Sequence, residues 1–361
     1  KSFTVCQPYG VVLIMSPWNY PFMLTLSPLA GALAAGNCCV VKPSAYSPAT
    51  SAVIRDILSD CFPPELVFVV EGGRAENQAL LDQSFDYIFF TGGVAVGREV
   101  MTKAAKHLTP VTLELGGKSP CVVDATAKLD LAAKRLVFGK LLNCGQTCVA
   151  PDYLLIDQRV KDEFLSYVKK WISAMYGENP LDNGGYVRMV NRKHFDRVTG
   201  LIEPSKVVFG GKSDPETLKI QPTILDNLSP DDPVMQEEIF GPLLPVLTFE
   251  HVQEALDFIN SRPHPLALYL FSQDKSVQTL FLRRAAFGGG CINDTIIHLA
   301  TSRMGFGGVG SSGMGSYHGK ESFDTFSHRK SIVKKYTWMD MPVRYAPYTP
   351  LKGRLLRLFL L

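Results

Sequence analysis

The sequence has no uninterrupted apolar run of the roughly 20 residues that a membrane-spanning helix requires. It contains eight cysteines but no Cys-x-x-Cys pair, and the paired ligand spacings of a zinc site are absent, so we expect no metal centre. A chain of 361 residues does not need disulfide staples, and these cysteines form no regular framework. We therefore expect free thiols and a reducing, cytoplasmic location.

An excess of positive charge is also missing. The chain carries 37 Lys and Arg residues against 34 Asp and Glu residues, and no basic run contains interleaved aromatic residues. A basic patch with aromatic side chains is typical of nucleic-acid binding, so we expect no nucleic-acid partner. The length allows two domains with cores of their own. The chain starts at Lys1 and enters a strand-like pattern at once, which indicates that an N-terminal part of the fold precedes it.

Short apolar runs alternate with helical segments through the first 116 residues. The expected strands cover residues 11–15, 39–41, 67–70, 87–90 and 111–114, and the expected helices cover residues 22–35, 48–61 and the segment that follows Gly97 up to Lys106. This alternation predicts a parallel, doubly wound sheet, in which ligands bind beyond the carboxyl ends of the strands. Asn19, Lys42, Glu114 and the loop from Gly92 to Gly97 all follow such ends.

The second half continues in the same α/β style. Helices are expected at residues 129–142, 160–175, 251–260 and 275–285, and strands at 221–225, 244–249, 267–271 and 327–336. We predict two doubly wound α/β domains, a Rossmann-like cofactor domain at 8–116 and a catalytic domain at 117–326. Residues 1–7 and 327–338 are expected to form a small β oligomerisation arm, and residues 339–361 a C-terminal tail.

The loop from Leu142 to Ala150 carries Cys144 and Cys148 beside a glycine. Cys148 is our candidate for a covalent nucleophile, although both cysteines taken alone are equally consistent with ordinary buried thiols. His318 and Asp324 allow a cysteine–histidine–carboxylate hydrolase as an alternative. That alternative leaves the cofactor-like first half without a function.

Other candidates each have a structural alternative. Gly92-x-x-x-x-Gly97 suits a phosphate at a helix N-terminus, but a plain strand-to-helix turn fits equally well. Lys42 is either a ribose ligand or a surface lysine. Glu114 follows an apolar strand, where a raised pKa would suit a general base, or it binds a backbone N–H. Glu238 belongs either to an exposed acidic loop or to a ligand-binding site.

Taken together, these motifs resemble the aldehyde dehydrogenase superfamily, and most closely its class 3 branch. Seven stretches match in the family's order: residues 17–21 (PWNYP), 41–44 (VKPS), 90–97 (FTGGVAVG), 113–118 (LELGGK), 143–148 (NCGQTC), 238–242 (EIFGP) and 306–310 (FGGVG). Residues 312–319 and 325–329 are similar to class 3 in particular. Such a member oxidises aldehydes to carboxylic acids with NAD or NADP, passing through a thiohemiacetal and a thioester.

The resemblance implies a role for each catalytic residue. The Cys148 thiolate attacks the aldehyde, the Asn19 amide and the Cys148 backbone N–H hold the oxyanion, and Glu114 activates the hydrolytic water. The implied cofactor residues are Lys42 at the adenine-side ribose, Thr91, Gly92 and Gly97 near the pyrophosphate, Glu238 at the nicotinamide ribose and Phe240 behind the ring. The implied substrate walls are Tyr20, Leu24, Phe138 and Phe306, which favour medium or long aliphatic and aromatic aldehydes.

Two departures from the family pattern bear on cofactor and partners. Many relatives carry Glu where this chain has Ala45, and losing a carboxylate that repels a 2′-phosphate predicts use of both NAD and NADP. The tail from Lys352 to Leu361 alternates basic and apolar residues, so weak membrane association is a possible role but a packed or frayed end is favoured. The arm implies a homodimer. A CoA-acylating enzyme and a crystallin-like protein with a relict site remain as alternatives.

Overall fold

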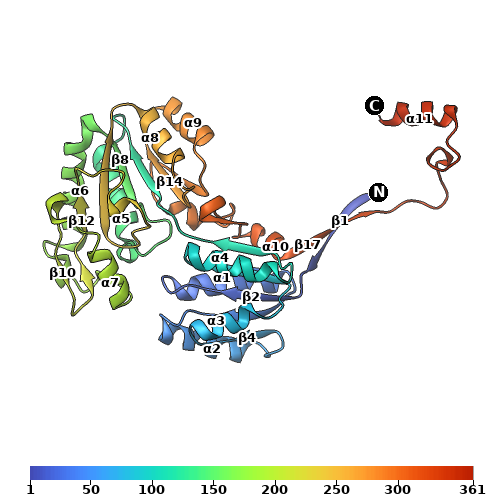
Figure 1. Cartoon of the computed structure of the whole chain (residues 1–361), viewed down its shortest axis with the longest axis horizontal. Helices are drawn as coiled ribbons and strands as arrows, with labels where there is room; N and C mark the ends of the chain where they lie inside the picture. Colours follow the sequence, from blue (N-terminus) through green and yellow to red (C-terminus); the bar gives the residue numbers. More distant parts are fainter. Residues whose placement is uncertain (361) are drawn as a thin grey trace. The chain divides into compact units, whose positions relative to one another are not determined.

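The structure is a computed structural model that describes the backbone of residues 1–360 and the side chains of residues 1–358 (Figure 1). The chain divides into two compact units. One unit comprises Pro8–Ser327 and contains two β-sheets with their helices. The other comprises Lys1–Gln7 together with the residues that follow Ser327.

The first sheet of the large unit has six strands in the order β16-β6-β5-β2-β3-β4. Their bounds are β2 Val11–Met15, β3 Cys38–Lys42, β4 Val67–Val69, β5 Tyr87–Thr91, β6 Val111–Glu114 and β16 Gly313–Met314. The five strands predicted from the sequence are parallel, which confirms the expected doubly wound α/β fold. The strand order reverses between β2 and β5, since β3 and β4 follow on one side of β2 and β5 and β6 on the other, and ligands bind at such a switch point.

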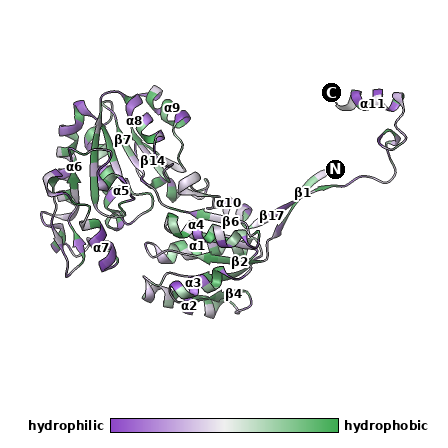
Figure 2. Cartoon of the chain, viewed as in Figure 1, coloured by the Kyte–Doolittle hydropathy of each residue, from purple (hydrophilic) through white to green (hydrophobic). Residues whose placement is uncertain are grey.

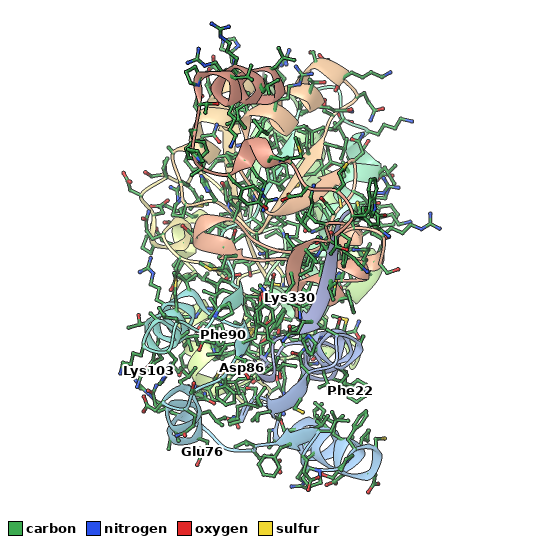
Figure 3. The ribbon with its side chains drawn as sticks, turned by 90° about the vertical axis from the view of Figure 1, so that its right-hand side faces the viewer. Phe22, Glu76, Asp86, Phe90, Lys103 and Lys330 are labelled. Carbon is green, nitrogen blue, oxygen red and sulfur yellow. The ribbon has the colours of Figure 1, made fainter. Side chains whose placement is uncertain are left out.

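Alternating side chains of this sheet face two helix layers. One face packs on α1 Pro21–Ala34 and α2 Pro48–Cys61, and the other on α3 Arg74–Leu81 and α4 Val94–Ala105. Phe90, for example, is buried against the α4 side, while Asp86 accepts a hydrogen bond from the Val11 N–H and ties β5 to β2 (Figure 3). Helix α3 was not predicted, because only its final leucine is buried.

The second sheet has seven strands in the order β15-β14-β7-β8-β13-β12-β9, and only β9 is antiparallel to its neighbour. Its strands are β7 Pro120–Val123, β8 Tyr153–Asp157, β9 Val207–Phe209, β12 Thr223–Leu225, β13 Leu243–Phe249, β14 Ala267–Phe271 and β15 Gly289–Ile292. Its helices are α5 Leu129–Leu141, α6 Lys161–Tyr176, α7 Arg192–Thr199, α8 Val252–Asn260 and α9 Lys275–Arg284, and β10 Ser213–Asp214 pairs with β11 Lys219–Ile220.

The central strands of both sheets are apolar, and the polar residues gather on the outer faces of the helices (Figure 2). In the second sheet, one face packs on α5 and α6, and the opposite face packs on α7, α8 and α9. Strands buried on both faces read as continuous apolar runs, which explains why β13 and β14 were recognisable in the sequence.

The chain returns to the first sheet near its end. Gly313 and Met314 form β16 and pair with Glu114 and Leu113 of β6, although residues 117–326 were expected in the second domain. Helix α10 (Lys320–Thr325) then packs on α1. The returning strand matters for chemistry, because it covers the free edge of β6 beside Glu114.

The small unit is a two-stranded sheet of β1 (Ser2–Pro8) and β17 (Ser327–Val333), followed by helix α11 (Pro350–Leu360). The Lys1 amino group donates to the Lys334 carbonyl at 2.9 Å. Leu351 and Leu358 of α11 are 67% and 81% exposed, so this helix carries apolar side chains in solvent. No helix of the described residues is long and apolar enough to cross a membrane.

Candidate active site

A cavity of about 410 Å³ opens at the switch point of the first sheet. The first sheet contributes the segments that follow β2 and β5, together with the end of β6. The second sheet contributes the loops that precede β8 and β13. The lining residues are Pro17, Trp18, Asn19, Leu24, Thr91, Gly92, Gly93, Val94, Glu114, Leu115, Gly116, Cys148, His194, Arg197, Glu237, Glu238 and Phe240. The structure thus brings together Cys148, Glu114 and Asn19.

The loop that carries Cys148 has an unusual backbone. Asn143, Cys144 and Gly145 have consecutive φ angles of 51°, 57° and 74°, in the left-handed region that most L-residues avoid. Gly145 is required for a second reason, because a Cβ there would collide with the Gly241 carbonyl oxygen. This turn redirects the chain from α5 into the segment that presents Cys148.

Asn19 and this loop are locked together by hydrogen bonds. The Asn143 side chain donates to the Asn19 carbonyl at 3.0 Å, and the Asn19 side chain donates to the Gln146 carbonyl at 3.1 Å. Gln146 is buried, and its side-chain oxygen accepts from the Val190 N–H at 2.9 Å. The relative positions of Asn19 and Cys148 are therefore fixed before any ligand arrives.

Replacing Gly145 with alanine is expected to destabilise the protein by more than about 2 kcal/mol and to remove most activity, because strain and collision act together. Chemical denaturation measures the first effect, and initial rates of the NAD-dependent aldehyde oxidation that the resemblance implies measure the second. Gly36→Ala is the matched control, since Gly36 has a φ of 90° but only ordinary contacts with Pro8. It should cost about 1–2 kcal/mol and leave activity intact. Equal activity in the two variants would contradict the role given to the turn.

The Cys148 thiol lies in an environment that disfavours its thiolate. Burial, followed by the charges of Glu238 and Glu114, raises the pKa of Cys148 to about 12, although the backbone N–H groups of Cys148 and Val149 act in the opposite direction. The chemistry that the resemblance implies requires either a lowered thiol pKa or a base that takes the proton. This geometry favours the base.

Glu114 meets the requirements of that base. Its side chain is 2% exposed, and neither carboxylate oxygen has a hydrogen-bond partner among the described residues. Burial raises the pKa of Glu114 well above its usual value. A buried carboxyl without partners, beside a thiol, is suited to proton transfer rather than to structural pairing.

The Asn19 amide uses one of its two N–H bonds on the Gln146 carbonyl and keeps the other for a ligand. Its side-chain oxygen is buried and has no hydrogen-bond partner within the described part of the chain. Tyr20, the next residue, shares a hydrogen bond of 2.7 Å with the Thr147 hydroxyl, beside Cys148. The segment after β2 is thus attached to the nucleophile loop at two successive residues.

The four predicted substrate-wall residues have different surroundings. Leu24 lines the cavity, and Tyr20 adjoins the nucleophile loop. Phe306 is 7% exposed and stacks on His318 with ring centroids 5.5 Å apart. Phe138 is 47% exposed on α5, and no described cavity includes it. That these four residues form the walls of the substrate site stays a prediction.

Four of the six predicted cofactor residues line the cavity: Thr91, Gly92, Glu238 and Phe240. Phe240 has a φ of 49° and meets the Trp18 ring edge-on at 5.4 Å. Glu238 packs against Gly116, where a Cβ would collide with its carboxylate, and burial raises its pKa to about 8.

Lys42 and Gly97 lie outside the cavity walls. The Lys42 amino group is buried and donates to the carbonyls of Pro43 and Gly72, at 2.9 and 2.6 Å, which leaves one N–H for a ligand. Gly97 is in the first turn of α4, where a Cβ would collide with Leu115. Close packing of helix on sheet is therefore sufficient reason for a glycine at position 97.

Trp18, His194 and Arg197 line the cavity without having been assigned a role from the sequence. Arg197 donates to the carbonyls of Glu238 and Ile239, so α7 holds the loop that presents Glu238. Helix α7 is short and polar, with only two buried side chains, so its sequence gave no signal of a helix. Of these three residues, Trp18 alone lies within a matched motif, so its place in the site could have been predicted from the sequence.

The family model described as the aldehyde dehydrogenase family matches residues 1–332. The chain belongs to the aldehyde dehydrogenase family. The 4,4′-diaponeurosporen-aldehyde dehydrogenase of Staphylococcus aureus is 48% identical over 96% of this chain and 76% of its own length. Aldehyde dehydrogenase family 3 member A2 of Rattus norvegicus is 47% identical over 100% of this chain and 75% of its own length. These relatives confirm the resemblance to class 3.

Solved structures agree with this assignment. The AldH of Staphylococcus aureus in a substrate-bound state has a TM-score of 0.97 and 47% identity, covering 100% of this chain and 79% of its own. A Mycobacterium tuberculosis aldehyde dehydrogenase complexed with NAD⁺ has a TM-score of 0.84 and 31% identity, covering 94% and 72%. The chain is accordingly an NAD(P)-dependent aldehyde dehydrogenase that oxidises aldehydes to carboxylic acids.

The cavity suits a dinucleotide in this aldehyde dehydrogenase. The Thr91 hydroxyl and the His194 Nδ1 are both buried, and neither has a partner among the described residues. Both residues line the cavity beside Trp18 and Phe240, which supply aromatic surface. Unpaired polar atoms on an aromatic wall are what a polar, planar ligand would satisfy.

Proposed function

We propose that this aldehyde dehydrogenase acts through Cys148 as nucleophile, Glu114 as general base and Asn19 as oxyanion donor. The observation that carries the proposal is the single cavity that joins these three residues, with the Glu114 carboxyl buried and unpaired. Thr91, Gly92, Glu238 and Phe240 hold the dinucleotide in the same cavity, with Lys42 at the adenine-side ribose. When bound, that cofactor would supply the hydride acceptor for oxidation of the carbon that Cys148 has attacked.

The first step forms a bond between Cys148 Sγ and the aldehyde carbon. Because burial raises the pKa of the Cys148 thiol to about 12, attack requires that its proton leave to a base, and we assign this role to Glu114, whose carboxylate oxygens have no partner among the described residues. The carbonyl oxygen becomes an oxyanion, which the free N–H of Asn19 and the Cys148 backbone N–H stabilise. Removing one such donor typically costs about 10²–10³ in rate.

The second half of the reaction hydrolyses the thioester that hydride loss leaves on Cys148. After releasing the Cys148 proton to solvent, Glu114 removes a proton from water, the hydroxide adds to the thioester carbon, and the carbon–sulfur bond breaks to release the acid and the thiolate, which takes the proton back from Glu114. A CoA-acylating enzyme needs no such base, because a thiol rather than water accepts the acyl group. Glu114 therefore supports hydrolysis.

Product analysis with a panel of aliphatic and aromatic aldehydes tests this proposal. In water enriched with ¹⁸O the acid should gain one labelled oxygen per NADH formed, and added CoA should leave the rate unchanged. If acyl-CoA were the product, the acyl group would be transferred to a thiol rather than to water, and the proposed hydrolysis would be wrong. Absence of NADH with every aldehyde would favour the crystallin-like alternative.

We further propose that both NAD and NADP serve as cofactors, because Ala45 carries no carboxylate to repel a 2′-phosphate. Replacing Ala45 with glutamate should lower kcat/KM for NADP by about tenfold or more and leave that for NAD within a few fold, since like charges would be brought together. Steady-state kinetics with each cofactor measure the ratio. Ala45→Gln is the uncharged control of similar size. A wild-type kcat/KM for NADP more than about a thousandfold below that for NAD would contradict the proposal.

We infer that the substrate is a medium or long aliphatic or an aromatic aldehyde, because Leu24 lines the cavity with an apolar side chain. The S. aureus relative is named for an aldehyde with the 4,4′-diaponeurosporene skeleton, which supports a large apolar substrate. We also propose a homodimer formed through β1 and β17. Phe3 and Val5 of β1 are exposed and offer apolar surface for this contact. All eight cysteines are free, which supports a reducing, cytoplasmic location.

A further inference from the structure

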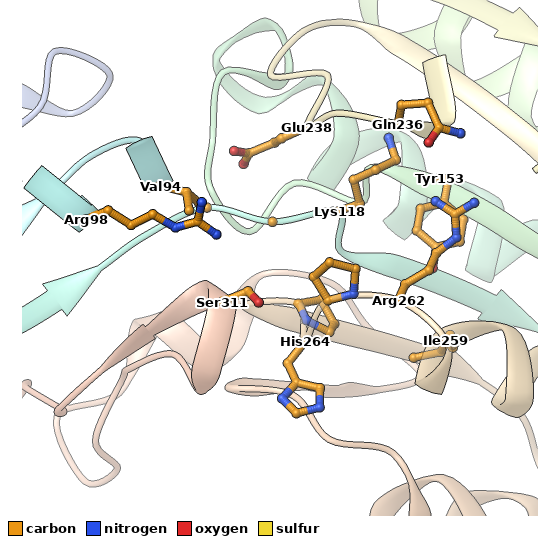
Figure 4. Close-up of a pocket in the computed structure, with 14 residues that line it drawn as sticks. Val94, Arg98, Lys118, Tyr153, Gln236, Glu238, Ile259, Arg262, His264 and Ser311 are labelled. Carbon is orange, nitrogen blue, oxygen red and sulfur yellow. The ribbon is translucent and has the colours of Figure 1, made fainter. Parts of the chain in front are cut away.

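A second cavity, of about 250 Å³, adjoins the active-site cavity (Figure 4). The two share Val94, Gly116 and Glu238. The other lining residues are Arg98 of α4, Gly117 and Lys118 of the linker between the sheets, Tyr153, Gln236, Ile259, residues 262–265 and Ser311. Its volume is below the ~300–1,000 Å³ of typical drug-sized ligand sites, so it suits a small ligand.

The charged side chains around this cavity are mostly cationic. Figure 4 shows Arg98 and Arg262 on opposite sides of it, with His264 between them on a third side. Lys118 does not add free charge, because its amino group forms an ion pair with Asp152 and donates to the carbonyls of Val234 and Glu237. The net charge that a ligand meets is therefore set by the two guanidinium groups.

Neither guanidinium is neutralised within the described part of the chain. Arg262 donates to the carbonyls of Met235 and Pro230, at 2.7 and 2.8 Å, and lies over the Phe258 ring, so all its partners are uncharged. Arg98 is exposed and takes part in no ion pair of the described residues. Guanidinium groups pair preferentially with carboxylates and phosphates, so two unneutralised ones across a cavity favour a doubly charged oxyanion.

One acidic side chain lines the cavity. Glu238 accepts a hydrogen bond from the Gly117 N–H and lies against Gly116. Burial, together with the nearby Asp152 charge, raises the pKa of Glu238 to about 8, so this carboxyl is largely neutral at pH 7 and does not cancel the arginines. An anion placed beside it would favour the neutral form further.

We propose that this cavity binds a small oxyanion with two or more negative charges, of the phosphate or tricarboxylate class, between Arg98 and Arg262. Binding there weakens cofactor binding, because the anion disfavours the carboxylate form of Glu238 and the carboxylate is the better acceptor for ribose hydroxyls. The binding itself depends only on the geometry of the second cavity. The effect on the cofactor rests on the proposed role of Glu238.

Calorimetric titration of the full chain, free of cofactor, with inorganic phosphate and separately with citrate tests the site. Chloride keeps the ionic strength constant, since exposed charges are screened by salt. We expect saturable binding that weakens about tenfold to a hundredfold in Arg98→Gln, because one charge-assisted hydrogen-bonding partner is lost. Arg283→Gln, at an exposed arginine of α9, is the matched control and should bind as the wild type does. The preferred probe shows whether phosphate or carboxylate is the better ligand.

Binding that is absent at tens of millimolar, or unchanged in Arg98→Gln, would overturn the proposal. NAD titrations at rising phosphate concentration separate coupling from competition. Coupling predicts that the apparent Kd for NAD rises about fivefold or more and then reaches a plateau. A rise of the apparent Kd for NAD without a plateau would mean that the cavity is part of the cofactor site. That result would also overturn the proposal. Because anion binding is measured without cofactor, its failure is distinguishable from a failure of the catalytic proposal.

Discussion

Cys148→Ser is expected to lower the rate of aldehyde oxidation by at least about 10⁴-fold, which is the scale of loss when a covalent nucleophile is removed. The serine hydroxyl is far harder to deprotonate than a thiol, and in this cavity burial and two carboxyl groups already oppose an anion at position 148. NADH formation under single-turnover conditions measures the loss. The dissociation constant for NAD should stay within a few fold of the wild-type value, because Cys148 is replaced by an isosteric side chain.

The loop supplies its own control. Cys144 lies four residues earlier, is fully buried, and donates to the Tyr186 hydroxyl at 3.4 Å. Cys144→Ser keeps that donor and should retain activity within about tenfold, since Cys144 is not among the residues that line the cavity. Equal losses in the two variants would show that the loop is merely sensitive to substitution, and would refute the assignment of Cys148 as the nucleophile.

The fold was predictable where strands are buried on both faces. β2, β5 and β6 appear in the sequence as apolar runs followed by polar residues, so both their parallel arrangement and the site beyond their carboxyl ends followed from the pattern. Helices α3 and α7 were not predicted, because each is only eight residues long and buries at most two side chains. The pairing of β16 with β6 joins residues about 200 positions apart, and no local signal encodes such a contact.

The site was predictable in its residue types but not in its electrostatics. Cys148, Glu114 and Asn19 belong to separate motifs, and their meeting in one cavity depends on the positions of both sheets. The sequence left open whether the thiol pKa is lowered or a base is needed. That outcome depends on burial and on the approach of Glu238 and Glu114, which are 90 and 34 residues away along the chain.

Glu114→Gln is expected to slow steady-state turnover by about 10²–10⁴-fold, the usual contribution of a general base. Gln has nearly the shape of Glu but cannot accept a proton, so both proton-transfer steps are affected. If thioester hydrolysis is the step that depends more on Glu114, one equivalent of NADH forms per active site and the acyl enzyme then accumulates. Rapid-mixing absorbance and intact-protein mass spectrometry detect these two species.

The pH dependence of the same pair of enzymes gives an independent reading of Glu114. A base works when deprotonated, and burial raises the pKa of Glu114 well above its usual value, so wild-type turnover should increase with pH through that raised pKa. The increase should be absent in Glu114→Gln, because no group at that position titrates. An unchanged pH profile in the variant would assign the base to another residue.

As pH rises, the free energy of unfolding of the wild type should fall while its activity increases. Because the folded-state pKa of Glu114 is raised, the folded protein binds this proton more tightly than the unfolded chain does, and its stabilising contribution is lost as pH rises through the folded pKa. Glu114→Gln removes that loss, so the variant should unfold at an equal or higher denaturant concentration than the wild type above neutral pH. An inactive variant that is at least as stable would separate catalysis from folding, since a buried carboxyl without a partner is retained against its cost only where its chemistry is needed.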